Sequence, residues 1–197
     1  MYKLTLIAFM ALAVSACAVS RVENLEVPLA YKADPKNAGL LGGMSCKALA
    51  QVTAADARSE KTLGVRVHES KPLKADVTTS SDVASWVQGG AQSFLTQNGL
   101  VMDAGGPRLH LAIDSVHTSE SIWHRSSYTA AIGLSAQLQN AAGKSCWTTS
   151  VQGTGGNYGY TGSVENYQET LNRALDSATQ HIAEQQGFKD ALCHCGN

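Results

Sequence analysis

The sequence predicts an α+β domain in which two helices pack on one face of a mainly antiparallel sheet. Three observations lead to this expectation. Several short stretches alternate apolar and polar residues, which is the pattern of half-buried strands. One helical repeat interrupts these stretches, and a second follows the last of them. Strands that are interrupted by one helix and closed by another are typical of a two-layer α+β fold.

The first strands are expected in the N-terminal half of the chain. Residues 46–54 are one candidate. Leu63–His68 is a clearer one, because its apolar side chains alternate with polar neighbours. Residues 55–59 lie between the two stretches and are expected to form a turn.

Two segments have the 3.6-residue apolar period of an amphipathic helix. The first is Ser80–Asn98, for which Ser80 or Ser81 is the expected N-terminal cap. The second is residues 163–186, with Ser163 as its expected cap. A glycine follows each segment, which favours the end of a helix.

Three further strands are expected between the two helices. Leu109–Val116 carries alternating apolar residues. Thr129–Leu138 and residues 144–152 flank the polar sequence Asn140–Gly143, which predicts an antiparallel hairpin. Residues 153–162 are rich in glycine and tyrosine, so they are expected to form a loop.

Residues 1–16 have the composition of a secretory signal. Leu4–Val14 is an apolar run well short of the roughly 20 residues that span a bilayer. Val14–Cys17 then resembles the lipobox of bacterial lipoproteins, in which a peptidase cuts before a cysteine that carries diacylglycerol. The resemblance implies that Cys17 is the lipidated residue. Ordinary cleavage after Ala16 or Ala18 is the alternative.

These features divide the chain into four expected parts. Residues 1–16 are the signal peptide, 17–43 the lipidated N-terminus and tether, 44–187 the α+β domain, and 188–197 a cysteine-containing tail. The residue after Cys17 is Ala18. An aspartate at that place tends to hold enterobacterial lipoproteins at the inner membrane. By resemblance, its absence implies the outer membrane, with the domain facing the periplasm.

Charge and motifs argue against several classes of function. The formal net charge is −1, and no basic stretch suggests nucleic acid as a partner. No serine lies in the Gly-x-Ser-x-Gly sequence of a nucleophile elbow. We therefore expect neither a catalytic site nor a cofactor. A hydrolase would require a deep pocket with converging polar groups.

Four cysteines remain besides Cys17: Cys46, Cys146, Cys193 and Cys195. In an oxidising compartment they are expected to form disulfides, and three pairings are open. A Cys193–Cys195 bridge would be sterically awkward, so the tail is expected to be joined to the body. The alternative is a metal site of Cys193, His194 and Cys195, whose soft ligands suit copper(I) or zinc. The sequence lacks the spaced second pair that is usual for zinc.

The histidines His110, His117 and His124 are seven residues apart. An odd separation on a strand places His110 and His117 on opposite faces, which argues against a shared site. Residues 117–127 are expected to form a loop. His117, Glu120 and His124 would then be exposed polar residues. The alternative is that these three side chains converge within the loop.

A tethered domain without a catalytic set is expected to bind another component of the envelope, either a protein or a glycan. Tyr158, Tyr160 and Tyr167 are candidates for a contact surface, because tyrosine is favoured at interfaces. The alternative is that they only decorate a loop.

The order and spacing of these features resemble the YajG family of bacterial lipoproteins over residues 44–187. The matching features are the turn Asp56-x-Arg58 with Leu63–Val65, the helix start Ser81-Asp82, the exit Gly99–Val101, the hairpin and the last helix. The 117–127 loop and the Cys-His-Cys tail depart from that pattern. The resemblance implies a lipid-anchored envelope protein, and it carries over no established enzymatic activity.

Overall fold

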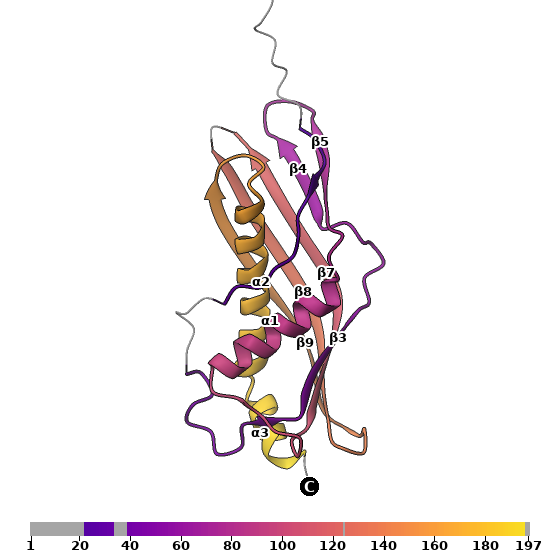
Figure 1. Ribbon diagram of the computed structural model, residues 1–197, viewed down its shortest axis with the longest axis vertical. Coiled ribbons are helices and arrows are strands. Elements are labelled where there is room, and N and C mark those ends of the chain that lie inside the picture. The colour runs from indigo at the N-terminus through magenta and orange to yellow at the C-terminus, as the bar shows by residue number, and fades with distance from the viewer. Residues whose placement is uncertain (1–21, 34–38, 124, 196–197) are drawn as a thin grey trace, which may run out of the picture.

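A computed structural model describes residues 22–33, 39–123 and 125–195. The expected signal peptide and lipobox, with Cys17 and Ala18, lie outside these residues. In the described part, long strands run along the length of the molecule and helices lie in front of them (Figure 1). None of these helices combines the length and the apolar character needed to cross a bilayer.

The large sheet is mostly antiparallel, as predicted. Its strands are β1 (Leu25–Glu26), β3 (Gln51–Asp56), β4 (Gly64–His68), β5 (Lys74–Thr78), β7 (Arg108–Ile122), β8 (Ser126–Gln139) and β9 (Ser145–Gly159). The spatial order is β1-β5-β4-β7-β8-β9. The β4–β5, β7–β8 and β8–β9 pairs are antiparallel. Both β3 and β4 run parallel to β7, one after the other along its edge.

A second, small sheet joins β2 (Ala48–Leu49) to β6 (Val101–Met102) in parallel. Residues 46–54, expected as one strand, therefore contribute to two sheets. The strand β5 was not predicted from the sequence.

The central hairpin is longer than the sequence predicts. The strand β7 continues to Ile122 and β8 begins at Ser126, so the expected loop at 117–127 is wrong apart from a tight turn. The strand β9 continues to Gly159, through most of the expected loop at 153–162. Pairing with a long neighbour overrides local turn preference here, because each added pair satisfies backbone groups.

The structure has three helices, α1 (Val83–Gln97), α2 (Val164–Glu184) and α3 (Gln186–His194), where two were expected. Ser163 caps α2 as predicted, accepting from the amide of Asn166. The cap of α1 is Asp82, whose carboxylate accepts from two amides of the first turn. The expected cap Ser81 instead accepts from the amide of Leu29.

The third helix occupies part of the segment expected as a tail. Its buried residues Phe188, Ala191 and Leu192 recur at helical spacing and join the hydrophobic core. The Phe188 ring also contacts Trp147 on β9. A short amphipathic helix is stable here because it buries this face, since an isolated helix of its length would not persist in water.

Two glycines on β9 allow α2 to lie close to the sheet. A Cβ added to Gly153 would lie 2.2 Å from the Ala174 carbonyl oxygen. One added to Gly155 would lie 2.2 Å from the Thr170 carbonyl oxygen. These glycines were expected to form a loop. They instead form the part of the sheet surface that α2 contacts.

Part of the expected tether at 17–43 belongs to the body of the protein. The strand β1 pairs in parallel with β5, and Val27 and Leu41 are fully buried in the core. Residues 22–33 run from the edge of the sheet at β5 to α2, where Asn172 donates to the Ala30 carbonyl at 3.0 Å. The chain is therefore attached to the domain from its first described residues onwards.

Candidate functional site

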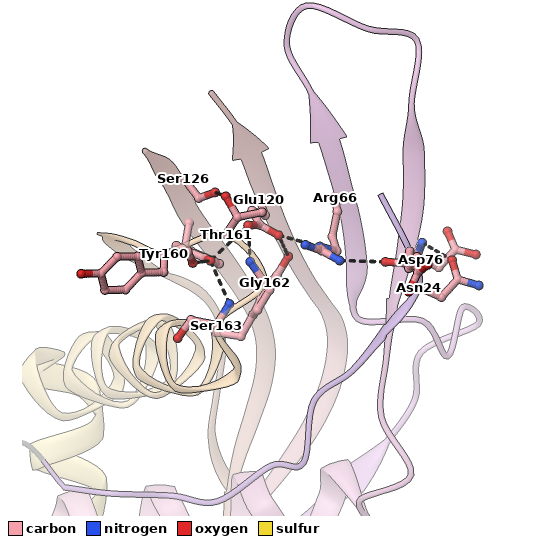
Figure 2. Close-up of polar contacts among 12 residues, drawn as sticks. Asn24, Arg66, Asp76, Glu120, Ser126, Tyr160, Thr161, Gly162 and Ser163 are labelled. Carbon is pink, nitrogen blue, oxygen red and sulfur yellow. Dashed lines mark hydrogen bonds and ion pairs between the residues drawn. The ribbon is translucent and has the colours of Figure 1, made fainter. Parts of the chain in front are cut away.

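A buried carboxylate lies where the ends of several elements meet. The parallel register of β4 and β7 places Arg66 opposite Glu120. Arg66 Nε donates to Glu120 Oε2 at 2.6 Å, and the Tyr167 hydroxyl from α2 donates to the same oxygen at 3.0 Å. Oε1 accepts from the amide of Gly162 at 2.8 Å and from the Tyr128 hydroxyl at 3.1 Å. Figure 2 shows Arg66 and Gly162 converging on Glu120.

The electrostatics of this Glu120 cluster keep the carboxylate charged. Burial by itself would raise the pKa of Glu120. The hydrogen bonds from Arg66 and Gly162 outweigh this effect, so the pKa lies below its ordinary value. Burial, together with the charge of Glu120, raises the pKa of Tyr167, which remains a donor. Because all four donors hold the carboxylate, the arrangement suits a structural clamp better than a catalytic base.

The same arginine also holds the N-terminal segment. Arg66 Nη1 donates to the Glu23 carbonyl at 2.8 Å (Figure 2). Beside this contact, the Asp76 amide donates to Asn24 Oδ1 at 2.9 Å. The cluster therefore ties together the start of the described chain, the sheet and the beginning of α2.

The sequence did not identify Glu120 as a buried residue. It was expected to be an exposed loop residue, and this prediction is wrong, since its exposure is 0%. A usable signal was present in the alternation Val116, Thr118, Glu120, Ile122, all of which are buried. Because Thr118 and Glu120 are polar, the series does not alternate apolar with polar residues, and this part of the strand was not predicted.

A second ion-pair group lies in the connection between β3 and β4, where the chain moves away from the edge of β7. Arg58 Nε and Nη2 donate to the two carboxylate oxygens of Asp56 at 2.8 and 3.0 Å, and Lys61 Nζ lies 3.1 Å from Oδ2. The hydrogen bond from Arg58 holds the pKa of Asp56 far below its usual range. This arrangement closes the turn, and it borders an open groove of about 440 Å³.

The sheet face opposite the helices carries an open groove of about 560 Å³. Its polar lining comes from four strands: Thr53, His110, Ser135, Gln137, Thr148, Thr149 and Ser150. His110 is the one titratable side chain among the lining residues, and its Nδ1 lies 2.7 Å from the Thr53 hydroxyl. Hydroxyl and amide groups over an alanine floor can bind through hydrogen bonds. Thr53 and His110 do pair a hydroxyl with an imidazole, but Nε2 of His110 has no hydrogen-bond partner among the described residues, so no third group there orients the ring as in a catalytic triad.

The histidines do not form a shared site. A β-bulge interrupts the register of β7 between Ile113 and Ser115. The extra residue at the bulge shifts the in–out alternation of side chains by one position. His110 and His117 therefore point to the same open face, and the prediction of opposite faces is wrong. They line different grooves nevertheless. His124 lies outside the described residues.

The four cysteines form two disulfides in the structure, Cys46–Cys193 and Cys146–Cys195. Both therefore attach the C-terminal segment to the body. With the sulfurs of Cys193 and Cys195 bonded, their thiolates are not free to bind a metal, and the Cys-His-Cys metal hypothesis is not favoured. Within the described ranges, no group of three or more His, Cys, Asp or Glu residues has a metal-binding arrangement.

The three tyrosines considered as a contact surface separate into two groups. Tyr167 is buried in the Glu120 cluster, so it cannot contribute to a surface. Tyr158 and Tyr160 are 77% and 90% exposed. They lie at the end of β9 and just beyond it.

The class of protein follows from a comparison with known families. Residues 44–192 match the model of a family of uncharacterized lipoproteins, and the chain belongs to this YajG-like family. Membership implies association with the cell envelope.

The fold is similar to that of a solved structure, and a second structure has a more distant likeness. Protein XCC0632 from Xanthomonas campestris is similar with a TM-score of 0.51 at 8% identity, over 87% of this chain and 97% of that one. A minor lipoprotein from Acinetobacter baumannii has a TM-score of 0.40 at 13% identity, over 73% of this chain and 92% of that one. No curated relative matches the chain.

Proposed function

We propose that this protein is a non-catalytic lipoprotein, anchored through Cys17 at the periplasmic face of the outer membrane, that binds another envelope component. The open sheet face is the proposed binding surface. The observation that carries this proposal is the groove across β3, β7, β8 and β9, which is lined by hydroxyl and amide side chains and left uncovered by the helices.

The lining favours a protein segment over a glycan as the bound component. Serine, threonine and glutamine side chains can pair with the backbone groups of an extended segment. The lining holds no Trp, Tyr or Phe on which a sugar ring would stack. Small side chains along the floor, including Ala112 and Ala55, let a partner backbone approach closely.

Site-specific photo-crosslinking in intact cells tests this proposal. A photoreactive amino acid is placed at Gln137 or Thr148 in the groove, and at exposed Glu184 on α2 as a matched control. We expect a discrete adduct from the groove positions and none from the control. Digestion of the adduct with protease or with glycosidase identifies the class of partner. Equal labelling at all three positions, or no adduct from the groove, would contradict the proposal.

A further inference from the structure

Exposed aromatic side chains gather at one end of the molecule. Trp123, in the β7–β8 turn, is 54% exposed, and Tyr158 and Tyr160 at the end of β9 are more exposed still. The two segments are neighbours, because Ser126 pairs with Gly159. Tryptophan and tyrosine combine an apolar body with a polar tip, and they are enriched where protein meets the boundary between lipid and water.

The backbone that carries these side chains is fixed from beneath. The buried Tyr128 hydroxyl shares its proton between the Tyr160 carbonyl and Glu120, and the Gly162 amide donates to Glu120. Figure 2 shows the Tyr160 ring pointing away from the Glu120 cluster while its carbonyl faces inward. The aromatic rings are therefore presented outward from an ordered backbone, which limits the loss of backbone entropy on binding.

The same end receives the N-terminal segment. The strand β1 runs parallel to β5, so residues 22–24 lie on the side of the β4–β5 turn (Figure 1). The Arg66 contact fixes the chain at Glu23. Cys17 precedes Glu23 by six positions, a span of about 20 Å at full extension. A lipid on Cys17 therefore brings this end within reach of the bilayer surface.

Charges around the aromatic side chains fit a phospholipid surface. Lys71 in the β4–β5 turn and Arg125 beside Trp123 are both exposed. Acids are also present at this end, among them Glu23, Glu69 and Glu165 in the first turn of α2, and Glu69 accepts a hydrogen bond from the Ser121 hydroxyl. Lysine and arginine can pair with lipid phosphates at the membrane surface.

We propose that this aromatic end, formed by Trp123, Tyr158 and Tyr160 with Lys71 and Arg125, rests in the headgroup region of the phospholipid bilayer that holds the anchor. The inference rests on the proposed lipidation of Cys17. In this orientation, α3 and its disulfides lie at the far end from the membrane (Figure 1). The open sheet face then points sideways into the periplasm, where a partner can reach it.

Quenching of tryptophan fluorescence by brominated lipid tests the contact. The mature protein is reconstituted in vesicles of phosphatidylethanolamine and phosphatidylglycerol that contain lipids brominated near the headgroup. Trp86 is buried, and Trp147 lies near α3 at the opposite end, so neither should be quenched. We expect quenching that is lost in Trp123→Phe and retained in the control Trp147→Phe. Quenching that survives Trp123→Phe, or its absence in membrane-bound protein, would overturn the proposal.

The anchor and the aromatic contact can fail separately, and the experiment distinguishes them. Mass spectrometry of the same sample shows whether Cys17 carries lipid. If it does not, the Cys17 thiol is coupled to a maleimide phospholipid and the quenching is measured again. Quenching in that sample supports the aromatic contact although the natural anchor has failed. A photo-crosslinker at Tyr160 that captures a protein rather than lipid would instead assign this end to a protein partner and overturn the bilayer proposal.

Discussion

Glu120 on β7 connects β4, β8, the loop before α2 and α2 itself through its hydrogen bonds. Its carboxylate is fully buried, and it receives donors from Arg66, Tyr128, Gly162 and Tyr167. A buried ion pair of this kind adds little over a well-packed apolar substitute. Removing one partner, however, leaves the other charge without compensation. The cluster should therefore respond strongly to the loss of a single charge.

Replacement of the carboxylate by an amide tests this at the residue scale. In Glu120→Gln the buried Arg66 guanidinium loses its counter-charge, and we expect the free energy of unfolding to fall by about 3–5 kcal/mol. Urea denaturation of the mature domain measures it. The control is Glu169→Gln, which breaks the exposed Arg173–Glu169 pair and should cost no more than about 0.5 kcal/mol. Similar losses of stability in both variants would show that the buried cluster contributes no more to stability than an exposed ion pair does.

At the scale of single elements, the close approach of α2 to β9 explains why the glycines of this strand are not in a loop. Gly153 and Gly155 point towards the helix and have no room for a side chain. Gly156 differs, because the nearest atom to an added Cβ is 3.8 Å away. Substitutions at these three glycines therefore distinguish the effect of packing against α2 from the effect of a residue's intrinsic preference for a strand.

Alanine substitutions test the packing. We expect Gly153→Ala to destabilise the protein by about 1–3 kcal/mol, because the new methyl group would push α2 off the sheet. Gly155→Ala should act in the same direction. Gly156→Ala is the control and should change stability by less than about 0.5 kcal/mol. Thermal unfolding followed by circular dichroism measures all three, and equal effects would rule out the close approach.

The helix α3 depends on covalent as well as apolar attachment. One disulfide connects Cys193 to Cys46, which lies just before β2, and the other connects Cys195 to Cys146 on β9. They place the C-terminal segment against the end of the domain where Phe188 is buried. Burial and cross-linking therefore act on the same short element.

Peptide mapping without reduction tests this pairing. We expect Cys46–Cys193 and Cys146–Cys195 peptides and neither of the other two pairings. Cys146→Ser with Cys195→Ser should lower the free energy of unfolding by about 2–5 kcal/mol, the usual cost of losing a native disulfide. Free thiols at both tail positions in protein isolated from cells would contradict the assignment and bring back the metal hypothesis.

At the scale of the whole molecule, the N-terminal segment links the proposed anchor to the domain. Residues 22–33 are packed against the sheet and α2, so only a few residues separate Cys17 from the attached part of the chain. A domain held in this way has a limited choice of orientations at a membrane. The proposed binding surface and the aromatic end are then presented in fixed directions.

Loss of the anchor cysteine tests the attachment itself. In Cys17→Ser the thiol that would receive diacylglycerol is absent, so we expect the protein to leave the membrane fraction. Cell fractionation and labelling with palmitate measure the change. Ser15→Ala is a control, because it keeps the cysteine. Membrane attachment without label in the wild-type protein would refute lipidation.

Much of the fold was visible in local sequence patterns. The helical period of 80–98 and 163–186 and the strand alternation of 63–68 and 129–138 led to the helices α1 and α2 and to much of the sheet. These patterns suffice because one-sided burial imposes a period of 3.6 or 2 on neighbouring residues. The order and spacing of these local features over residues 44–187 led to the family to which the chain belongs.

Other features depend on residues far apart in the chain, and only the tertiary structure decided them. The bulge after Ile113 brings His110 and His117 to one face, and the register of β4 on β7 buries Glu120 beside Arg66. The choice of disulfide partners depends in the same way on how β9 and α3 meet. Alternation within a strand does not specify which strands lie next to it. Nor does it specify which face a side chain takes beyond a bulge, or which polar residue is paired beneath a helix. Those depend on long-range packing, whereas the sequence by itself determined the class of protein, the periodic elements and the expected anchor at Cys17.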